Sequence, residues 1–490
     1  MAIPKFYYIL TTRYPSVHSK LSTKQSCDHL LLDLNAILHN CLDRSKSEND
    51  IITLLKEYTK HLIFLLEPKK SVLLAVDGVP PLAKIKEQAV RRKCSRSSSG
   101  IDKNCLTPGT RFMELVCDTL EEYVDELMAE HPGLYVEVST SKIKGEGEQK
   151  MMRYLKKYSK QKFILFSPDA DLIVMTMQSN DNEVSLIREP FNYRLNNTRA
   201  KRFEILNIKS LKNKLTESMV GIKQQTALRD LMLMFMIMGN DLLPSPQGLG
   251  ASDSTIQLII GSLCEYYKAF PGRNIIDDQG LIGFKNLFKL FEIIQMKQLD
   301  EYKRLYPPSA KILQEKVLQL IIPVNSTLSE KKKLIKDHLN KYESEKFDQW
   351  RISQYKGQDY KKIGEEYLQR LQWLYDYYTQ HLAANDYWTF DHDLVPYIPD
   401  LLHCKPPADF KDNHKDKEIT QLVQLSLVTP LGSIGLLPLS YQSDSQIKKY
   451  LTSESQEKFQ FEKLDQMIGY LSGLEKDPES LTSGLKNLSL

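Results

Sequence analysis

The stretch His29–Asn35, HLLLDLN, is an apolar run that contains a carboxylate near its end, Asp33. Three later runs follow the same pattern: SVLLAVDG reaches Asp77, KFILFSPDAD reaches Asp169 and Asp171, and LMFMIMGND reaches Asp241. Amphipathic helical stretches at 51–66 and 111–128 separate the first three runs. Short buried strands that alternate with helices predict an α/β fold with a parallel central sheet flanked by helices. The fourth run is compatible with a strand or a helix.

The carboxyl ends of parallel strands are where functional groups collect in such sheets. Two further acids, Glu146 and Glu148, flank Gly147 in KGEGEQKMMRYL, and Gly145 precedes them. Glycine at both positions lets the backbone turn tightly and approach a ligand. Residues two apart in a strand share a face, so Asp169 and Asp171 could point into one site. Taken singly, each acid reads more simply as a helix cap or a solvated turn residue.

Seven converging carboxylates would repel one another unless cations neutralised them. Hard oxygen ligands without His or Cys favour Mg²⁺ or Mn²⁺. Two such ions, about 3.5–4 Å apart, activate water and stabilise the leaving oxygen in phosphodiester hydrolysis. The carboxylates alone therefore suggest a phosphoryl-transfer nuclease without specifying its substrate.

A basic segment, GVPPLAKIKEQAVRRK, comes directly after Asp77. Pro80 and Pro81 suit the first turn of a helix. On that helix one face carries Lys84, Gln88, Arg91 and Arg92. By itself this would be a solvated basic face. Beside a metal-loaded acidic site, the same cations could recognise a terminal phosphate through charge-assisted hydrogen bonds.

The composition is that of a folded protein with balanced charge. Among 490 residues, Lys plus Arg number 66 and Asp plus Glu 62, a net charge of +4, so any nucleic-acid site must be a local basic patch. The seven cysteines are scattered without a C-x-x-C pair, which indicates a reducing compartment rather than a disulfide framework or zinc ribbon. The N-terminus has no signal-peptide pattern, and the apolar run 231–239 is too short to span a membrane.

Four segments are predicted along the chain: a nuclease domain over 1–265, a helical, charged connector over 266–362, a second region over 363–440, and a helical, partly frayed tail over 441–490. Within them, 93–104 reads as a polar loop and 367–378 as an aromatic-rich helix. One further helix is expected near 456–472.

Consecutive blocks of the chain, in order, resemble the Xrn-type 5′→3′ exoribonucleases. The blocks are IPKFYYILTTRYP, LLLDLNAILHNC, AVDGVPPLAK with QAVRRK, DKNCLTPGTRFM, KGEGEQK, PDADLIVM and MGNDLLP, then LQWLYDYY and PYIPDLL. They cover roughly 1–250 and 363–440. The resemblance implies a PIN/FEN-like α/β nuclease fold with a mostly helical second conserved region over the active site. It also implies RNA decay by processive release of mononucleotides from 5′-monophosphorylated single-stranded RNA.

The resemblance also implies roles for individual residues. The metal ligands for two Mg²⁺ ions, for which Mn²⁺ may substitute, correspond to Asp33, Asp77, Glu146, Glu148, Asp169, Asp171 and Asp241. The 5′-phosphate pocket corresponds to Lys84, Gln88, Arg91 and Arg92. His39 matches a base-stacking histidine, and Trp388 is the candidate for the facing aromatic residue, with core packing as the open alternative. Gln149 stands where the family usually has His, and the loop after Arg92 is short.

Two other functions compete with the exoribonuclease. A flap-type DNA nuclease of the same superfamily would be expected to carry a helix–hairpin–helix DNA clamp, which is not visible here. A non-catalytic RNA-binding relative would have lost acids, whereas all seven are intact. We expect the partner to be single-stranded RNA with a 5′-monophosphate, with no membrane and no obligate protein partner, and the location to be intracellular, in the cytoplasm rather than the nucleus.

Overall fold

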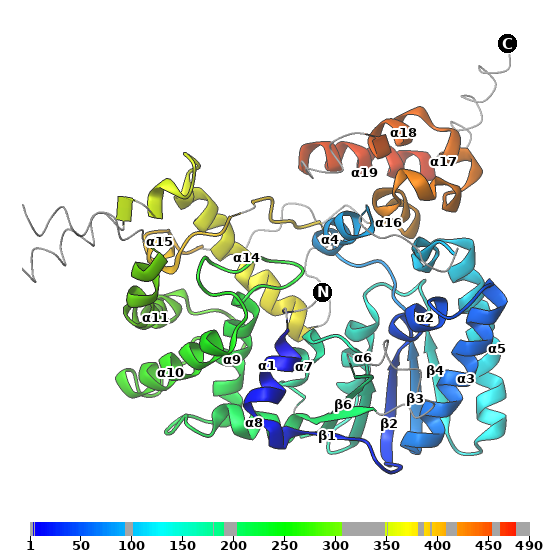
Figure 1. Ribbon diagram of the computed structural model, residues 1–490, viewed down its shortest axis with the longest axis horizontal. Coiled ribbons are helices and arrows are strands. Elements are labelled where there is room, and N and C mark those ends of the chain that lie inside the picture. Colours follow the sequence, from blue (N-terminus) through cyan, green and yellow to red (C-terminus); the bar gives the residue numbers. More distant parts are fainter. Residues whose placement is uncertain are drawn as a thin grey trace, which may run out of the picture.

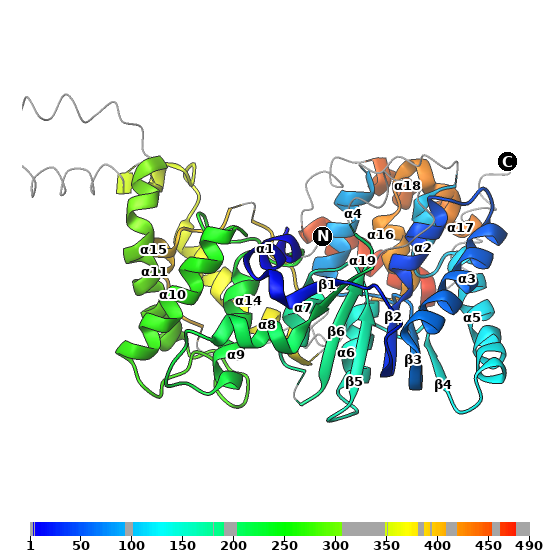
Figure 2. The same ribbon diagram turned by 60° about the horizontal axis from the view of Figure 1, so that its bottom comes forward.

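A computed structural model of the chain describes residues 3, 5–93, 101–179, 181–190, 203–305, 348–349, 351–380, 387–392, 394–407, 419–452 and 461–476. One half of the molecule is a twisted sheet with helices on both faces, and the other half is helical (Figure 1). Seen after rotation, the two halves lie side by side and the C-terminal helices gather over the sheet half (Figure 2). Among the described residues no helix is both long and apolar enough to cross a membrane.

The sheet has seven strands. Their spatial order is β1 (His18–Lys20), β7 (Glu204–Asn207), β6 (Glu183–Arg188), β5 (Lys162–Phe166), β2 (Cys27–Asp33), β3 (Pro68–Ala75) and β4 (Tyr135–Ser139). The five strands from β6 to β4 are parallel, and β7 pairs antiparallel with both β6 and β1. The predicted α/β class with a parallel central sheet is confirmed. Because β2 has β3 on one side and β5 on the other, the chain reverses its direction across the sheet beside β2.

Burial on both faces explains why the strands read as continuous apolar runs. Leu31 faces one core and Leu30 the other, and both are fully buried. Three helices cover the Leu30 face: α2 (Leu34–Leu42), α3 (Glu48–Leu66) and α5 (Arg111–Glu130). The last two confirm the helices predicted at 51–66 and 111–128, and each begins at a hydroxyl N-cap.

The Leu31 face shares one core with the helical half of the molecule. The elements on that side are α1 (Phe6–Arg13), η1 (Pro15–Val17), α6 (Gly147–Leu155), α7 (Asp171–Thr176), α8 (Ile208–Thr216), α9 (Gln224–Ile237), α10 (Asp253–Ala269), α11 (Phe284–Leu305), α14 (Tyr360–Gln380) and α15 (Ile398–Leu401). The fourth apolar run is therefore a helix, α9, whose residues 231–237 are fully buried. The aromatic-rich helix predicted at 367–378 is confirmed as part of α14.

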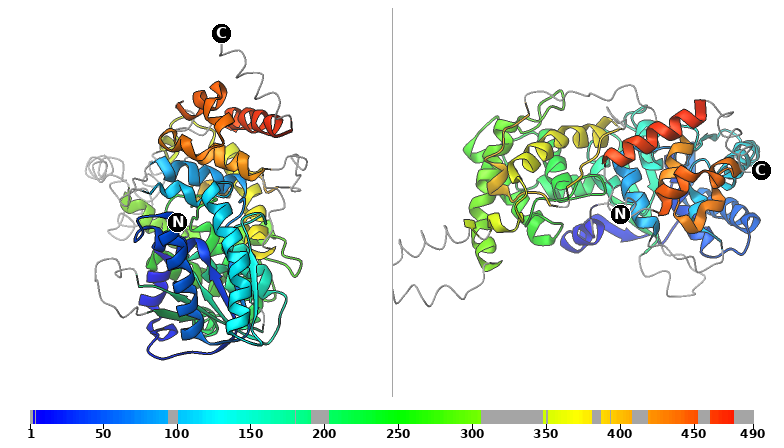
Figure 3. Two further views of the ribbon diagram at one scale, coloured as in Figure 1. Left: turned by 90° about the vertical axis from the view of Figure 1, so that its right-hand side faces the viewer. Right: turned by 90° about the horizontal axis from the view of Figure 1, so that it is seen from above.

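A third core joins the C-terminal helices to α4 (Leu82–Lys93), the predicted basic helix. Its other elements are α16 (Gln421–Val428), η5 (Leu431–Leu436), α17 (Leu439–Ser443), α18 (Ser445–Thr452) and α19 (Phe461–Lys476), with η2 (Lys103–Leu106) close by. These helices, orange and red in Figure 3, lie over the sheet half of the molecule, and α16 is the one that packs against α4. Most of the predicted polar loop (94–100), part of the predicted connector (306–347) and the frayed end (477–490) fall outside the described residues.

Candidate functional site

The strand-end acids meet beside β2. Asp33 is the last residue of β2, and Asp77 lies two residues beyond β3. Between them comes the start of α6, where the Gly147 N–H donates to Asp77 Oδ1 at 2.6 Å. A side chain at position 147 would crowd this contact, because a Cβ atom there would lie 3.3 Å from Asp77 Oδ1 and 3.4 Å from Asp33 Oδ1. Gly145 adopts a φ of +100°, a backbone conformation that favours glycine, so the two glycines of the K-G-E-G-E turn serve different needs, a left-handed turn and space beside the carboxylates.

Asp169 and Asp171 are close together for a different reason from the one predicted. Strand β5 ends at Phe166, and Asp171 is the first residue of helix α7. The expectation that the two acids share one face of a strand is therefore wrong. They are joined by a turn instead, in which the Asp171 N–H donates to Asp169 Oδ1 at 3.1 Å.

Lys84 lies among the carboxylates. Its ammonium nitrogen is 2.8 Å from Asp241 Oδ2 and 3.2 Å from Glu146 Oε1, and its side chain is only 7% exposed. Burial alone would lower the pKa of Lys84, but Glu146 and Asp241 raise it well above its ordinary value. Burial acts to raise the pKa of Asp241, and the positive charge around it, led by Lys84, lowers that pKa below its ordinary value.

The remaining acids crowd one another. Burial and the charge of Asp77 raise the pKa of Asp33 to about 7, and burial and Glu146 raise that of Asp77 to about 6. Burial and Asp169 raise the pKa of Asp171 to about 7. For Glu148, burial and Asp169 raise the pKa well above its ordinary value. The single positive charge of Lys84 does not balance the negative charge of all these carboxylates. The cluster would therefore bind a further cation or protons.

Several residues that orient these acids were not predicted. Asn35 accepts a hydrogen bond from the Asp77 N–H at 3.0 Å, and Ser167 donates to Asp33 Oδ2 at 2.9 Å. Lys150 joins the ends of β3 and β4 by donating to two backbone carbonyls at 2.6 and 2.7 Å. Burial lowers the pKa of Lys150 to about 8. Asn35 and Ser167 lie within two residues of a predicted acid, which is the signal that could have found them.

One cavity of about 1280 Å³ brings acids and predicted RNA contacts together. It is lined by Asp33, Asp77, Glu146, Glu148 and Asp169, by Lys84, Gln88 and Arg91 of α4, and by His39 of α2. Asp171 is buried behind this lining, where both of its carboxylate oxygens accept hydrogen bonds from the chain. Asp241 also lies behind it, against Lys84.

The polar side chains of the basic helix α4 have different surroundings: some line the cavity, and others bond to neighbouring parts of the protein. Gln88 is buried, and its Oε1 accepts a hydrogen bond from Gln424 Nε2 of α16 at 3.2 Å. The Arg91 side chain is 45% exposed. Arg92 instead donates to the Thr107 hydroxyl and does not line the cavity. Burial and the charge of Arg91 lower the pKa of Arg92 to about 10.

His39 lines the cavity, and protein surrounds its ring on the other sides. This partial burial, together with the positive charges of Arg91 and Arg92, lowers the pKa of the imidazole to about 4. The ring is therefore neutral at pH 7.

Trp388 does not face His39 across the cavity. Its side chain is 3% exposed and packs on Trp373, with ring centroids 4.5 Å apart. The Arg370 guanidinium lies 5.1 Å from the centre of its ring. The structure supports core packing for Trp388, the alternative left open above, rather than stacking on a base.

The donor chemistry of the acids fits a hard divalent cation, because every candidate ligand is a carboxylate oxygen. Within the described residues, no group of three or more His, Cys, Asp or Glu side chains is arranged to hold a metal ion as it stands. The Lys84 ammonium lies between Glu146 and Asp241 and forms an ion pair with each. A metal would have to draw the carboxylates together around itself.

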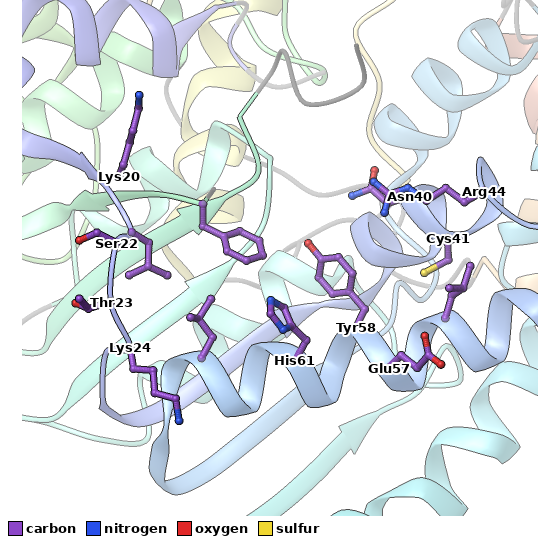
Figure 4. A pocket seen from close by; sticks show the side chains of 14 residues that line it. Lys20, Ser22, Thr23, Lys24, Asn40, Cys41, Arg44, Glu57, Tyr58 and His61 are labelled. Carbon is purple, nitrogen blue, oxygen red and sulfur yellow. The ribbon is translucent and has the colours of Figure 1, made fainter. Parts of the chain in front are cut away.

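Two other features lie near this site. Gln149 is 2% exposed, and its amide has no hydrogen-bond partner among the described residues. A second cavity of about 990 Å³ opens between α2 and α3 and contains none of the predicted site residues (Figure 4). At its edge Tyr58 and Asn40 both donate to Glu189, at 2.6 and 3.1 Å.

Comparison with known proteins points to one family. The profile described as XRN 5′-3′ exonuclease N-terminus matches residues 1–99 and 93–190. The chain is 28% identical to 5′-3′ exoribonuclease 1 of Schizosaccharomyces pombe, over 59% of this chain and 25% of that protein. It is 24% identical to the human 5′-3′ exoribonuclease 1, over 92% of this chain and 32% of that protein. The chain thus spans about a quarter to a third of the length of these relatives.

Solved structures give weaker likenesses. The catalytic core of Rad2 in complex with DNA substrate (complex III) matches with a TM-score of 0.31 and 13% identity, over 66% of this chain and 82% of that one. The T5 D15 protein co-crystallised with metal ions matches with a TM-score of 0.30 and 14% identity, over 57% of this chain and 91% of that one. These scores are too low to carry an argument, so the fold class rests on the strand order and on the family match.

Proposed function

We propose that this chain, whose residues 1–190 match the profile described as XRN 5′-3′ exonuclease N-terminus, is an exoribonuclease that degrades RNA from the 5′ end. We propose further that the substrate is single-stranded RNA with a 5′-monophosphate, and that mononucleotides are released processively in RNA decay. One observation carries the proposal. The carboxylates that would serve hydrolysis and the polar side chains Gln88 and Arg91, which would bind a terminal phosphate, line the same cavity.

The proposed cofactor is a pair of Mg²⁺ ions, for which Mn²⁺ could substitute. The residues that would hold them are the acids Asp33, Asp77, Glu146, Glu148, Asp169, Asp171 and Asp241. Bound there, such ions supply an activated water and stabilise the leaving oxygen of the phosphodiester. The raised pKa of Asp33, about 7, and that of Asp77, about 6, support a site that needs more positive charge than Lys84 provides.

The wall formed by α4 would bind the 5′ end. Arg91 offers a partly exposed guanidinium, which can form charge-assisted hydrogen bonds with a phosphate. Gln88 has its oxygen engaged by Gln424, so its amide N–H groups remain as donors. Because α4 and the acids share one cavity, a phosphate held by Arg91 would set which phosphodiester lies over the acids. One nucleotide would then leave per cut.

His39 would bind the first base. Its neutral, solvent-accessible ring can stack on any base, a contact worth about 1–3 kcal/mol. A base stacked there must have left a duplex neighbour, so the 5′ end should be single-stranded.

The cellular location is also a proposal. The cysteines that the structure describes are all free thiols, which supports a reducing compartment. We place the protein inside the cell, in the cytoplasm rather than the nucleus.

The test is a cleavage assay on RNAs of one sequence that differ only in the 5′ group. With Mg²⁺ present, we expect mononucleotides from the monophosphorylated RNA and much slower cleavage of the hydroxyl and triphosphate forms. Equal rates on all three, or cleavage of a circular RNA, would overturn the 5′-end mechanism. Faster cleavage of a DNA flap would favour the DNA nuclease, and RNA binding without cleavage in any metal would favour the non-catalytic relative.

A further inference from the structure

Helix α14 directs two consecutive tyrosine hydroxyls at two carboxylates of the site. Tyr377 donates to Glu146 Oε2 at 2.7 Å, and Tyr378 donates to Asp171 Oδ2 at 2.6 Å. Both rings are buried, with 4% and 2% of their surface exposed. Neighbouring residues on a helix point about 100° apart, so α14 must lie between the two acids to reach both.

Each tyrosine fixes one oxygen of its carboxylate. The other oxygen of Glu146, Oε1, lies 3.2 Å from the Lys84 ammonium. The other oxygen of Asp171, Oδ1, accepts from the Ile3 N–H at 3.2 Å. The orientation of each acid is thus set by two segments that are distant in sequence, one of which is α14 in both cases.

We propose that Tyr377 and Tyr378 are positioning residues, which hold Glu146 and Asp171 in the orientation that binds the catalytic cations. This inference rests on the proposed function. Groups that hydrogen-bond to metal ligands orient them and tune their affinity. Helix α14 lies outside residues 1–190, which the family profile matches, so the metal site would be completed by a segment more than 200 positions further along the chain.

Core packing alone does not account for these contacts. The same helix buries Tyr375 and Tyr367 without bringing either hydroxyl to a carboxylate. Tyr375 OH accepts from Gln178 Nε2 at 2.8 Å, and Tyr367 OH has no hydrogen-bond partner in the described part of the chain. The stack of Tyr377 on Trp373, with centroids 5.4 Å apart, needs only the ring. The hydroxyls at 377 and 378 therefore have a role beyond filling space.

The experiment removes only the hydroxyls, in Tyr377→Phe and Tyr378→Phe, with Tyr375→Phe as the matched control. The affinity for Mn²⁺ is measured on the RNA-free protein by calorimetry, and thermal unfolding is recorded for each variant. We expect about tenfold weaker Mn²⁺ binding in the first two variants and unchanged binding in the control. Cleavage by the first two should recover when the metal concentration is raised.

A double-mutant cycle separates positioning from stability. In a Glu146→Gln background, Tyr377→Phe should cost little further Mn²⁺ affinity, because the carboxylate that it orients has gone. If Tyr377→Phe folds poorly, the Mn²⁺-induced rise in unfolding temperature, measured on the same sample, still reports its metal binding. That rise should be smaller than in the Tyr375→Phe control.

The outcomes distinguish this inference from the function beneath it. A wild-type protein that binds Mn²⁺ and cuts RNA, with both tyrosine variants matching its Mn²⁺ affinity, would overturn the positioning role alone. Additive losses in the cycle would do the same. A wild-type protein that neither binds Mn²⁺ nor cuts RNA would overturn the proposed function and this inference with it.

Discussion

The two walls of the cavity are built in different ways. The acid wall comes from strand ends, the turns after them and the start of α6, so the sheet brings its members together, which are Asp33, Asp77, Glu146, Glu148 and Asp169. The α4 wall, Gln88 and Arg91, sits on a helix that shares its core with the C-terminal helices. The sheet therefore fixes where these acids lie, and α14 orients one of them, Glu146, whereas the α4 wall depends on contacts with residues more than 300 positions away.

Removing a carboxylate from the acid wall should have the largest effect. Asp169→Asn keeps the shape of the side chain but removes a charge that would hold the cation. Metal-bound charge stabilisation is worth several kcal/mol, so we expect cleavage to fall by about a thousandfold or more. Mononucleotide release measures this.

The control is Asp28→Asn, which changes an acid at the start of β2, the strand whose other end carries Asp33. Asp28 is bonded there to the Lys162 N–H and to Lys70. It should leave cleavage within about twofold of wild type. Undiminished hydrolysis by Asp169→Asn would remove the acid wall from the mechanism.

Breaking the α4 wall should have a smaller and more selective effect. Arg91→Ala removes a charge-assisted contact worth about 1.5–3 kcal/mol, so cleavage of monophosphorylated RNA should fall roughly ten- to a hundredfold. Cleavage of 5′-hydroxyl RNA should change little. Like Arg91, which lies 3.5 Å from Glu87, Lys86 on the same helix is paired with an acid, Asp391. Lys86 does not line the cavity, so Lys86→Ala is the control. A parallel loss on both RNAs would mean that Arg91 does not read the 5′ group.

The acid wall should also make the stability of the metal-free protein depend on pH. The folded state raises the pKa of Asp33 and Asp171 to about 7 and that of Asp77 to about 6, from 3.8. Between about pH 4 and 7 the folded state binds more protons than the unfolded state, so stability falls as pH rises. We therefore expect the unfolding temperature to be a few degrees lower at pH 8 than at pH 5.5.

Mg²⁺ supplies the control for that comparison. At pH 8 it should restore the unfolding temperature, because it replaces the protons that the carboxylates have lost. At pH 5.5 it should have a smaller effect. An equal shift at both pH values would mean that Mg²⁺ binds elsewhere.

The same contrast explains what could be predicted from the sequence. Strand-end acids follow from short apolar runs and their spacing, so the parallel sheet and the grouping of the acids were accessible. The fourth run stayed ambiguous because residues 231–237 of α9 are all fully buried, so this part of the helix has no polar face to give it a helical period. Tyr377, Tyr378 and Gln424 could not be placed, because only the packing of distant helices brings them to the cavity.

The smallest predicted effect tests that long-range support directly. Gln424, 1% exposed on α16, donates to Gln88 Oε1 at 3.2 Å, and this contact leaves the Gln88 N–H groups as donors for a phosphate. Gln424→Leu removes one hydrogen bond worth about 0.5–1.5 kcal/mol, so the preference for monophosphorylated over hydroxyl RNA should fall roughly two- to tenfold. Mn²⁺ affinity should stay the same, because the acid wall is untouched. Ser426→Ala, also buried on α16 and with a hydroxyl that lacks a partner among the described residues, should change neither quantity. If Gln424→Leu weakens metal binding as much as it weakens 5′ preference, the two walls are not independent, and the C-terminal helices support the whole cavity rather than its phosphate-binding side.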